Sequence, residues 1–110
     1  MSVIIIDDSQ LKIKMIAKYI SKFISLYDVA ECGESALDLL ETNEYQFIFI
    51  DHHLPDCKGS DLLEQIKTVH YKSKIISISN DITVLTDYKQ FGYDDVFVYP
   101  FDESIKRIFR

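Results

Sequence analysis

Two apolar runs that each end in acid constrain this chain more than any other feature. Residues 3–6 read Val-Ile-Ile-Ile and lead into Asp7 and Asp8, while the run at residues 45–50 leads into Asp51. Continuous apolar runs of this kind are typical of strands that are buried on both faces of a parallel sheet. In such sheets, ligands bind beyond the carboxyl ends of the strands, where the strand order reverses. If the two runs form neighbouring strands, the three carboxylates converge at one such position.

Helix and strand patterns alternate along the rest of the chain. Apolar runs predict strands at residues 3–6, 27–30, 45–50, 74–79 and 96–99. Helical spacing predicts helices that begin after Ser9, near Ser35, at Ser60 and at Asn80–Asp81, and a last short helix over residues 102–110. The side chains predicted to face inward on the first, second and third helices are Ile13, Ile16, Ile20, Phe23, Ala36, Leu37, Leu40, Leu62, Leu63, Ile66 and Val69.

This alternation predicts an α/β fold, a doubly wound five-stranded parallel sheet with helices on both faces. The flavodoxin-like strand order 2-1-3-4-5 fits the count and places the first and third strands side by side. No linker or repeat divides the 110 residues, so residues 1–110 are expected to form one domain.

Charge and composition exclude several function classes. A formal net charge of −6 argues against a nucleic-acid footprint and against docking on anionic membranes. The apolar runs are too short to span a bilayer, and the chain begins without a signal-peptide pattern, so a cytoplasmic location is expected. Cys32 and Cys57 form no C-x-x-C pair, which favours reduced thiols.

The three acids pose an electrostatic problem that a divalent cation would solve. Asp8 with Ser9 can also cap a helix, and Asp51 can simply enter a loop. Neither role explains acids at the ends of two strands that a parallel fold would pair, and Asp7 beside a buried strand is costly without a partner. Oxygen ligands favour Mg²⁺, which often works with a phosphoryl group.

Ser79 adds a hydroxyl at the end of the predicted fourth strand. A serine in that place is commonly a turn former, but beside the acids it can hydrogen-bond an oxyanion. Asp51 is then the candidate nucleophile, as carboxylates are in aspartyl-phosphate chemistry. The metal would neutralise the charge that develops on a transferred phosphoryl group.

With these residues in this order, the chain resembles the response-regulator receiver domain, the phosphoacceptor module of two-component signalling. The resemblance covers nearly the whole chain. The matching segments are Ile6-Asp7-Asp8-Ser9, the acceptor segment from Phe49 to Gly59, Ile78-Ser79-Asn80, the segment from Phe91 to Asp95, and Tyr99-Pro100-Phe101.

The resemblance implies that Asp51 accepts a phosphoryl group from a phosphohistidine on a sensor histidine kinase or a phosphotransfer protein. Asp7 and Asp8 would organise Mg²⁺, with Asp51 and the backbone carbonyl of His53 as further ligands, and Ser79 would donate a hydrogen bond to the phosphoryl group. Such self-catalysed acceptance is not a turnover activity.

The resemblance also implies a fused or separate output domain, although none is recognised within residues 1–110, whose last helix is short. The face formed by residues 82–91, the last strand and the last helix is the one that the family uses for partners and homodimers. Direct contact with nucleic acid or with a membrane is not expected.

Four residues depart from the family pattern. Tyr99 stands where the family carries a lysine that pairs with the acceptor carboxylate, and a lost charge-assisted hydrogen bond costs about 1.5–3 kcal/mol. Val96 replaces the usual switch aromatic, Asn80 replaces a very small residue, and His53 lies where the family tunes loss of the phosphoryl group. We therefore predict that Mg²⁺ binding survives, whereas phosphorylation is slow or weakly coupled to the surface.

Three alternatives remain open on the sequence. A pseudo-receiver would bind its partner without phosphorylation, and the departures at Tyr99, Val96 and Asn80 favour it. A flavin carrier needs a phosphate-cradling loop where this chain has acids. An aspartate-nucleophile phosphatase requires an acid two residues after its nucleophile, and this chain has Ser9 at that position. His52 and His53 make a poor metal-chelating pair, because adjacent residues on a strand point to opposite sides.

Overall fold

The structure is a computed structural model that describes residues 2–24, 26–70, 72–99 and 109. Its centre is a five-stranded sheet with the order β2-β1-β3-β4-β5, in which every neighbouring pair is parallel. The strands are β1 (Val3–Ile6), β2 (Asp28–Ala30), β3 (Phe47–Asp51), β4 (Lys74–Ser79) and β5 (Asp95–Val98). The predicted sheet and its strand order are confirmed.

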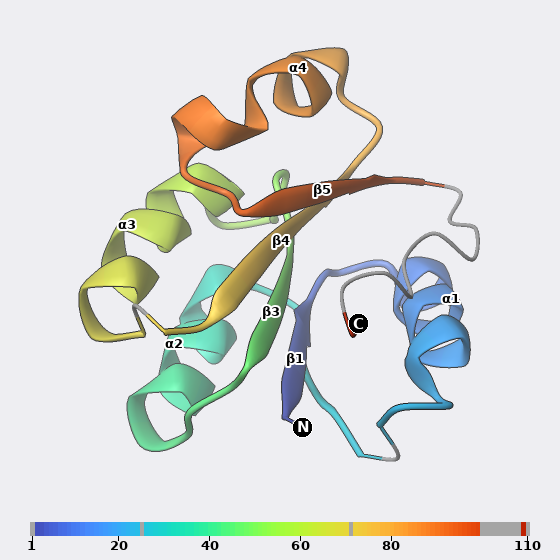
Figure 1. Cartoon of the computed structure of the whole chain (residues 1–110). Coiled ribbons are helices and arrows are strands. Elements are labelled where there is room, and N and C mark those ends of the chain that lie inside the picture. The colour runs from blue at the N-terminus through green and yellow to red at the C-terminus, as the bar shows by residue number, and fades with distance from the viewer. Residues whose placement is uncertain (1, 25, 71, 100–108, 110) are drawn as a thin grey trace.

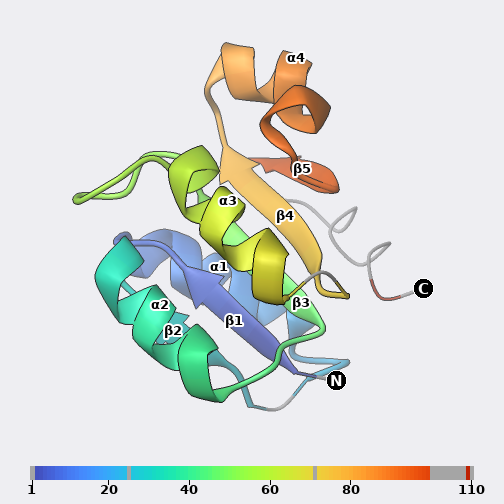
Figure 2. The same cartoon turned by 90° about the vertical axis from the view of Figure 1, so that its left-hand side faces the viewer.

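Four helices connect these strands and cover both faces of the sheet (Figures 1 and 2). They are α1 (Gln10–Ile20), α2 (Gly33–Thr42), α3 (Gly59–Val69) and α4 (Ile82–Phe91). Figure 2 looks onto the face that carries α2 and α3, with α1 behind the sheet. Helices on both faces explain why the central strands are continuously apolar, since neither face of the sheet meets water.

Two hydrophobic clusters, one on each face, hold these layers together. Ile4, Ile6, Ile48 and Ile50 point to the α2, α3 and α4 side, where they pack with residues such as Leu62. On the other face, the alternate strand residues Val3, Ile5 and Phe49 pack with Ile13, Ile16 and Ile20 of α1. Because successive side chains of a strand point to opposite faces of the sheet, each strand contributes alternate residues to the two clusters.

Several local predictions are wrong or shifted. Ser60 does not cap α3, whose N-cap is Lys58 without a side-chain hydrogen bond. Phe23 lies beyond the end of α1 and is 38% exposed, and Val69, the last residue of α3, is 70% exposed. Helical spacing alone does not show where a helix turns away from the sheet. The predicted last helix over residues 102–110 and Pro100 fall outside the described residues, apart from Phe109, which packs on the α1 side.

Candidate functional site

Asp7 and Asp51 lie side by side at the carboxyl edge of the sheet. The register pairs Ile6 of β1 with Ile50 of β3, so the residues that follow these two are neighbours. Asp7 is fully buried and Asp51 is 6% exposed, while Asp8 is on the surface. One carboxylate oxygen from each of the three acids lies within 4.8 Å of the others. The structure therefore brings together the acids that the sequence placed at one edge.

Asp7 carries a buried negative charge that the protein only partly compensates. Its Oδ1 accepts a hydrogen bond of 2.8 Å from the backbone amide of Ser9, but Oδ2 accepts none from the described residues. Burial raises the pKa of Asp7 above its ordinary value, and repulsion from Asp51 adds to this, although the Ser9 amide acts in the opposite direction. Apart from its ion pair with Lys12, Oδ2 of Asp7 has no partner among the described residues, and a buried carboxylate oxygen beside two other acids fits a divalent cation with oxygen ligands.

Lys12 is the functional residue that the sequence analysis missed. Its Nζ lies 3.1 Å from Oδ2 of Asp7 and 3.0 Å from Oδ2 of Asp51. Burial lowers the pKa of Lys12, but the hydrogen bond and charge of Asp51, together with Asp7, outweigh this effect and raise it. The ammonium group therefore remains charged and bridges two acids that face each other across β1 and β3.

The local sequence explains why Lys12 reaches the acids. Ser9 caps α1, with its hydroxyl oxygen accepting from the backbone amide of Lys12, which fixes the start of the helix directly after the acidic pair. Side chains on a helix lean toward its N-terminus. A lysine in the first turn of α1 consequently leans back toward the carboxyl edge of the sheet. The sequence signal that could have predicted this contact is the position of Lys12 in the first helical turn after the acidic pair.

The loop after Asp51 is held close to the strand from which it comes. Oδ1 of Asp51 accepts from the backbone amide of His53 at 3.2 Å, and the amide of Gly59 donates to the carbonyl of His52 at 2.6 Å. A Cβ on Gly59 would lie 2.5 Å from Oη of Tyr93 and 2.9 Å from the backbone oxygen of Asp51. Gly59 therefore permits a close approach between its own backbone and that of Asp51.

Ser79 lies at the end of β4, as predicted, and is 5% exposed. Its Oγ accepts a hydrogen bond of 2.9 Å from the backbone amide of Asp81, the N-cap of α4. The hydroxyl hydrogen is thereby left to donate to another group. Ser79 lines a cavity of about 320 Å³ together with Ser9, Lys12, Asp51, His53, Asn80 and Tyr99.

Strand β5 is shifted by one residue from the predicted range 96–99, so Val96 is its second residue and Tyr99 directly follows its end. The amide of Tyr99 donates to the carbonyl of Ser79 at 3.4 Å, and its side chain packs partly on the α1-side core. Val96 pairs with Ser77 in β5 and is half-buried. The cavity therefore has an aromatic side chain where the family pattern has a lysine.

The prediction that the two adjacent histidines point to opposite sides of a strand is wrong, because both follow the end of β3 and their ring centroids lie 5.0 Å apart. His52 is buried, and its Nδ1 lies 3.0 Å from Oη of Tyr93. Burial lowers the pKa of His52, with the neighbouring His53 contributing further. The side chain of His53 is 61% exposed and its Nε2 lies 2.8 Å from Oδ2 of Asp81. The ring nitrogens Nδ1 of His52 and Nε2 of His53 therefore have different partners.

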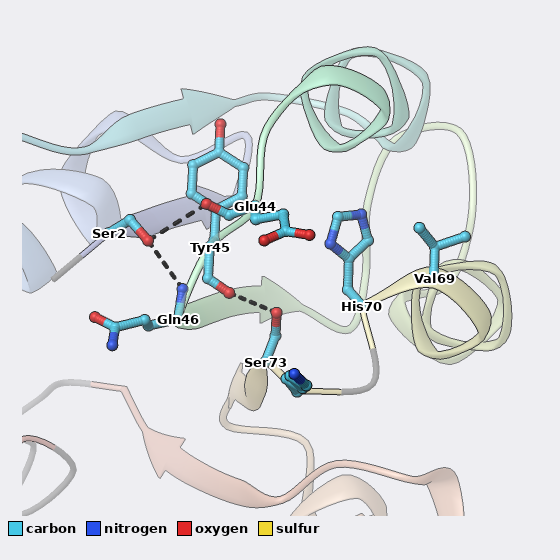
Figure 3. Close-up of a pocket in the computed structure, with 8 residues that line it drawn as sticks. Ser2, Glu44, Tyr45, Gln46, Val69, His70 and Ser73 are labelled. Atoms are coloured by element: carbon cyan, nitrogen blue, oxygen red, sulfur yellow. Dashed lines mark hydrogen bonds between the residues drawn. The ribbon is translucent and has the colours of Figure 1, made fainter.

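A larger cavity, of about 510 Å³, lies at the opposite, amino edge of the sheet (Figure 3). Its polar groups bind each other: Oγ of Ser2 accepts from the amide of Gln46 at 3.0 Å, and Oγ of Ser73 donates to the carbonyl of Tyr45 at 2.5 Å. These bonds tie together the segments that precede three strands, which is a structural role.

Cys32 and Cys57 are both free thiols. Within the described residues, no helix combines the length and apolar character that crossing a membrane requires.

The chain has a parallel sheet of flavodoxin-like strand order, with an acidic cluster at the carboxyl ends of the neighbouring strands β1 and β3. Both features are those expected of the family that the sequence resembles. A family model described as "Response regulator receiver domain" matches residues 3–107. The chain therefore belongs to this family, whose members are the phosphoacceptor domains of two-component signalling.

Individual relatives agree with this assignment. The cell cycle transcriptional regulator CtrA of Caulobacter vibrioides is 31% identical over 113 residues, which cover 98% of this chain and 48% of that protein. The chain thus spans about half the length of this curated relative. The chemotaxis response regulator CheY4 of Vibrio cholerae has the same fold, with a TM-score of 0.85 at 20% identity over 99% of this chain and 96% of that one.

A third relative was solved with ligands. It is a response regulator protein from Burkholderia pseudomallei, described with a phosphorylated aspartic acid, a calcium ion and citrate. Its TM-score is 0.81 at 19% identity, over 94% of this chain and 62% of that one. At this identity the likeness shows the fold.

Proposed function

We propose that this chain is a working phosphoacceptor domain, in which Asp51 takes a phosphoryl group from the phosphohistidine of a sensor histidine kinase or a phosphotransfer protein. The observation that carries the proposal is the convergence of Asp7, Asp8 and Asp51 within 4.8 Å, at the edge of the sheet where Ser79 also ends its strand. One carboxylate oxygen of Asp51 attacks phosphorus as the nitrogen–phosphorus bond breaks, and that bond's electron pair returns to the histidine nitrogen.

Each polar group at the site has a part in this transfer. Asp7, Asp8, Asp51 and the backbone carbonyl of His53 would hold Mg²⁺, which neutralises charge on the phosphoryl oxygens when bound. The buried Oδ2 of Asp7, which accepts no hydrogen bond from a backbone amide and already attracts the Lys12 ammonium, supports a cation at this position. Ser79, whose oxygen already accepts from the amide of Asp81, donates its hydrogen to a phosphoryl oxygen. The reaction modifies the protein itself and is not a turnover activity.

The complete set of acids favours this function over a pseudo-receiver. A module that only bound a partner would have no use for a fully buried Asp7, because this charge costs stability even with Lys12 beside it. The flavin-carrier and phosphatase alternatives are not supported by the family to which the chain belongs.

Partners are proposed on the same basis. We infer that residues 1–110 act as one receiver domain in the cytoplasm and signal to a fused or separate output domain. The face formed by α4 and β5 is the candidate surface for this output and for a homodimer, because it exposes Ile82 and Val98, at 75% and 51%. Direct binding of nucleic acid or membrane is not part of the proposal.

The test is phosphorylation by a small phosphodonor in the presence of Mg²⁺, read by intact mass. The expected result is one phosphate-sized mass increase that needs Mg²⁺ and is absent from Asp51→Asn. An exposed acid offers a matched control, because Asp61→Asn on α3 makes the same chemical change away from the site. No adduct on the wild-type protein with any donor, or an adduct that persists in Asp51→Asn, would overturn the proposal.

A further inference from the structure

Lys12 is the cation that this site presents to its acceptor carboxylate. Its Nζ makes a 3.0 Å hydrogen bond to Oδ2 of Asp51 and lies 3.1 Å from Oδ2 of Asp7. The side chain of Lys12 is 19% exposed, so water screens these charges less than at an open surface. Within the described part of the chain, no other lysine or arginine forms an ion pair with either acid.

Among the described residues that line the cavity, Lys12 is the one lysine or arginine. Tyr99, which follows β5, lines the cavity on that side, and its phenol can donate one hydrogen bond but carries no positive charge. Phosphoryl transfer depends on positive groups near the equatorial oxygens, because catalysis there is mainly positioning and charge stabilisation. In this chain the cation therefore comes from the first turn of α1, on the other side of Asp51.

The position of Lys12 suits contact with a phosphoryl group on Asp51. Lys12, Asp51 and Ser79 line the same cavity, whose volume is about 320 Å³. A phosphoryl group bonded to Asp51 would place its oxygens about one bond beyond the carboxylate, within reach of an ammonium that already contacts Oδ2. The four-carbon stem of lysine allows such a small movement.

We propose that Lys12 is the phosphoryl-positioning cation of this receiver, supplied from α1 in place of a cation at residue 99. The proposal rests on Asp51 being the acceptor, as set out under Proposed function. Lys12 stays protonated throughout: it holds a phosphoryl oxygen and neither takes nor gives a proton. The phosphoryl group moves from donor to Asp51 as described above.

The same geometry has a second consequence, for the divalent cation. The Lys12 ammonium lies between two acids that would also hold the metal, so the two cations compete for Asp7 and Asp51. Removing Lys12 should therefore have opposite effects on two measurements. Phosphorylation slows because the phosphoryl group loses a cation, while Mg²⁺ binds more tightly because a competing charge is gone.

The experiment compares Lys12→Met with Lys14→Met on the full chain. Lys14 is exposed on the same helix and its substitution changes the net charge equally. At saturating Mg²⁺, Lys12→Met is expected to slow phosphorylation by a small donor about tenfold, as for one charge-assisted hydrogen bond. Lys12→Arg, which keeps the charge, should retain most of the rate. Equal rates in Lys12→Met and Lys14→Met would overturn the proposal.

Calorimetric titration with MgCl₂ at fixed ionic strength gives the second measurement. Lys12→Met should bind Mg²⁺ about thirtyfold more tightly, the effect of removing one unit charge about 4 Å from a divalent cation in water. A merely structural lysine would leave the affinity unchanged or weaken it, and either result contradicts the proposal. Thermal melts check that each variant folds, and Lys12→Gln replaces Lys12→Met if that variant does not.

The two measurements also separate this proposal from the proposed function. If the wild-type protein takes no phosphoryl group, Asp51 is not an acceptor and the proposed function fails. Tighter Mg²⁺ binding by Lys12→Met would then still show that Lys12 occupies the cation position. If the wild-type protein is phosphorylated and the Lys12 variants behave like Lys14→Met in both assays, only the role of Lys12 is lost.

Discussion

Nε2 of His53 lies 2.8 Å from Oδ2 of Asp81, and this contact joins the loop after Asp51 to the N-cap of α4. Asp81 also accepts from the amide of Thr83, and its own amide donates to Oγ of Ser79. The start of α4 is therefore connected to the loop after Asp51 and to the Ser79 hydroxyl.

Replacing His53 with alanine tests this connection. Loss of the side-chain contact to Asp81 should increase amide hydrogen exchange in the first turn of α4 about three- to fivefold, the effect of one ordinary hydrogen bond. Amides of α3 provide the internal control, since α3 does not contact Asp81 through His53. Uniform protection of α4 in wild type and variant would show that the contact does not hold the helix.

Asp7→Asn should make the protein more stable and weaken its response to Mg²⁺. An asparagine keeps an oxygen for the Ser9 amide but removes a fully buried charge, which should stabilise by about 1 kcal/mol, or roughly 4–8 °C in Tm for a domain of this size. Wild type should gain stability on addition of Mg²⁺, and the variant should gain much less.

The pH dependence of this difference has a definite sign. Because the pKa of Asp7 is raised by burial, the folded state binds its proton more tightly than the unfolded state. The charged Asp7 therefore destabilises above its folded pKa, and the penalty disappears as the pH falls below it toward 3.8. Thermal melts should show the largest gain from Asp7→Asn at neutral pH. A gain that grew at acid pH would contradict this account.

Asp56→Asn should destabilise the protein through the start of α2. Oδ1 of Asp56 accepts from the amide of Gly33 at 2.8 Å, and Oδ2 accepts from the amide of Glu34 at 3.0 Å. These backbone bonds lower the pKa of Asp56, so its stabilising effect is present above 3.8 and is lost as the pH falls through the lower folded value. Melting temperatures across this pH range measure the effect.

The control for Asp56 is Asp38→Asn, an exposed acid on α2 itself. At neutral pH, Asp56→Asn should melt below Asp38→Asn. The two should converge once the pH is below the folded pKa of Asp56, because the wild-type carboxyl is then protonated. Equal melting temperatures at neutral pH would show that the contact between the acceptor loop and α2 contributes nothing.

Gly59→Ala should destabilise by about 1–3 kcal/mol, as expected when atoms are forced into a packed position. The new Cβ would meet Oη of Tyr93 at 2.5 Å and the backbone of Asp51 at 2.9 Å, so either the tyrosine or the acceptor strand must shift. Chemical denaturation measures the cost. Ser60→Ala is the control and should be close to neutral, because Ser60 does not cap α3. A large loss from Ser60→Ala would restore the original capping prediction.

Much of the site could be predicted from the sequence, because strands of a parallel sheet carry their ends to one edge. The apolar runs before Asp7 and Asp51 predicted β1 and β3, and the strand order placed both acids together. Ser79 followed from the same rule. Helix surfaces were predicted less well: Phe23 and Val69 fit the helical period and yet lie outside the core.

The sequence by itself determined the sheet and the acids at its carboxyl edge, because both depend on local pattern and on the regular geometry of parallel strands. The interpretation of Tyr99 as a replaced lysine came only from the resemblance to the receiver family. Only the tertiary structure decided that Lys12 supplies a charge to Asp51. That contact depends on how α1 is rotated against the sheet and on the lean of its first-turn side chains. No local pattern encodes that rotation, since it is set by how Ile13, Ile16 and Ile20 pack on the strands beneath.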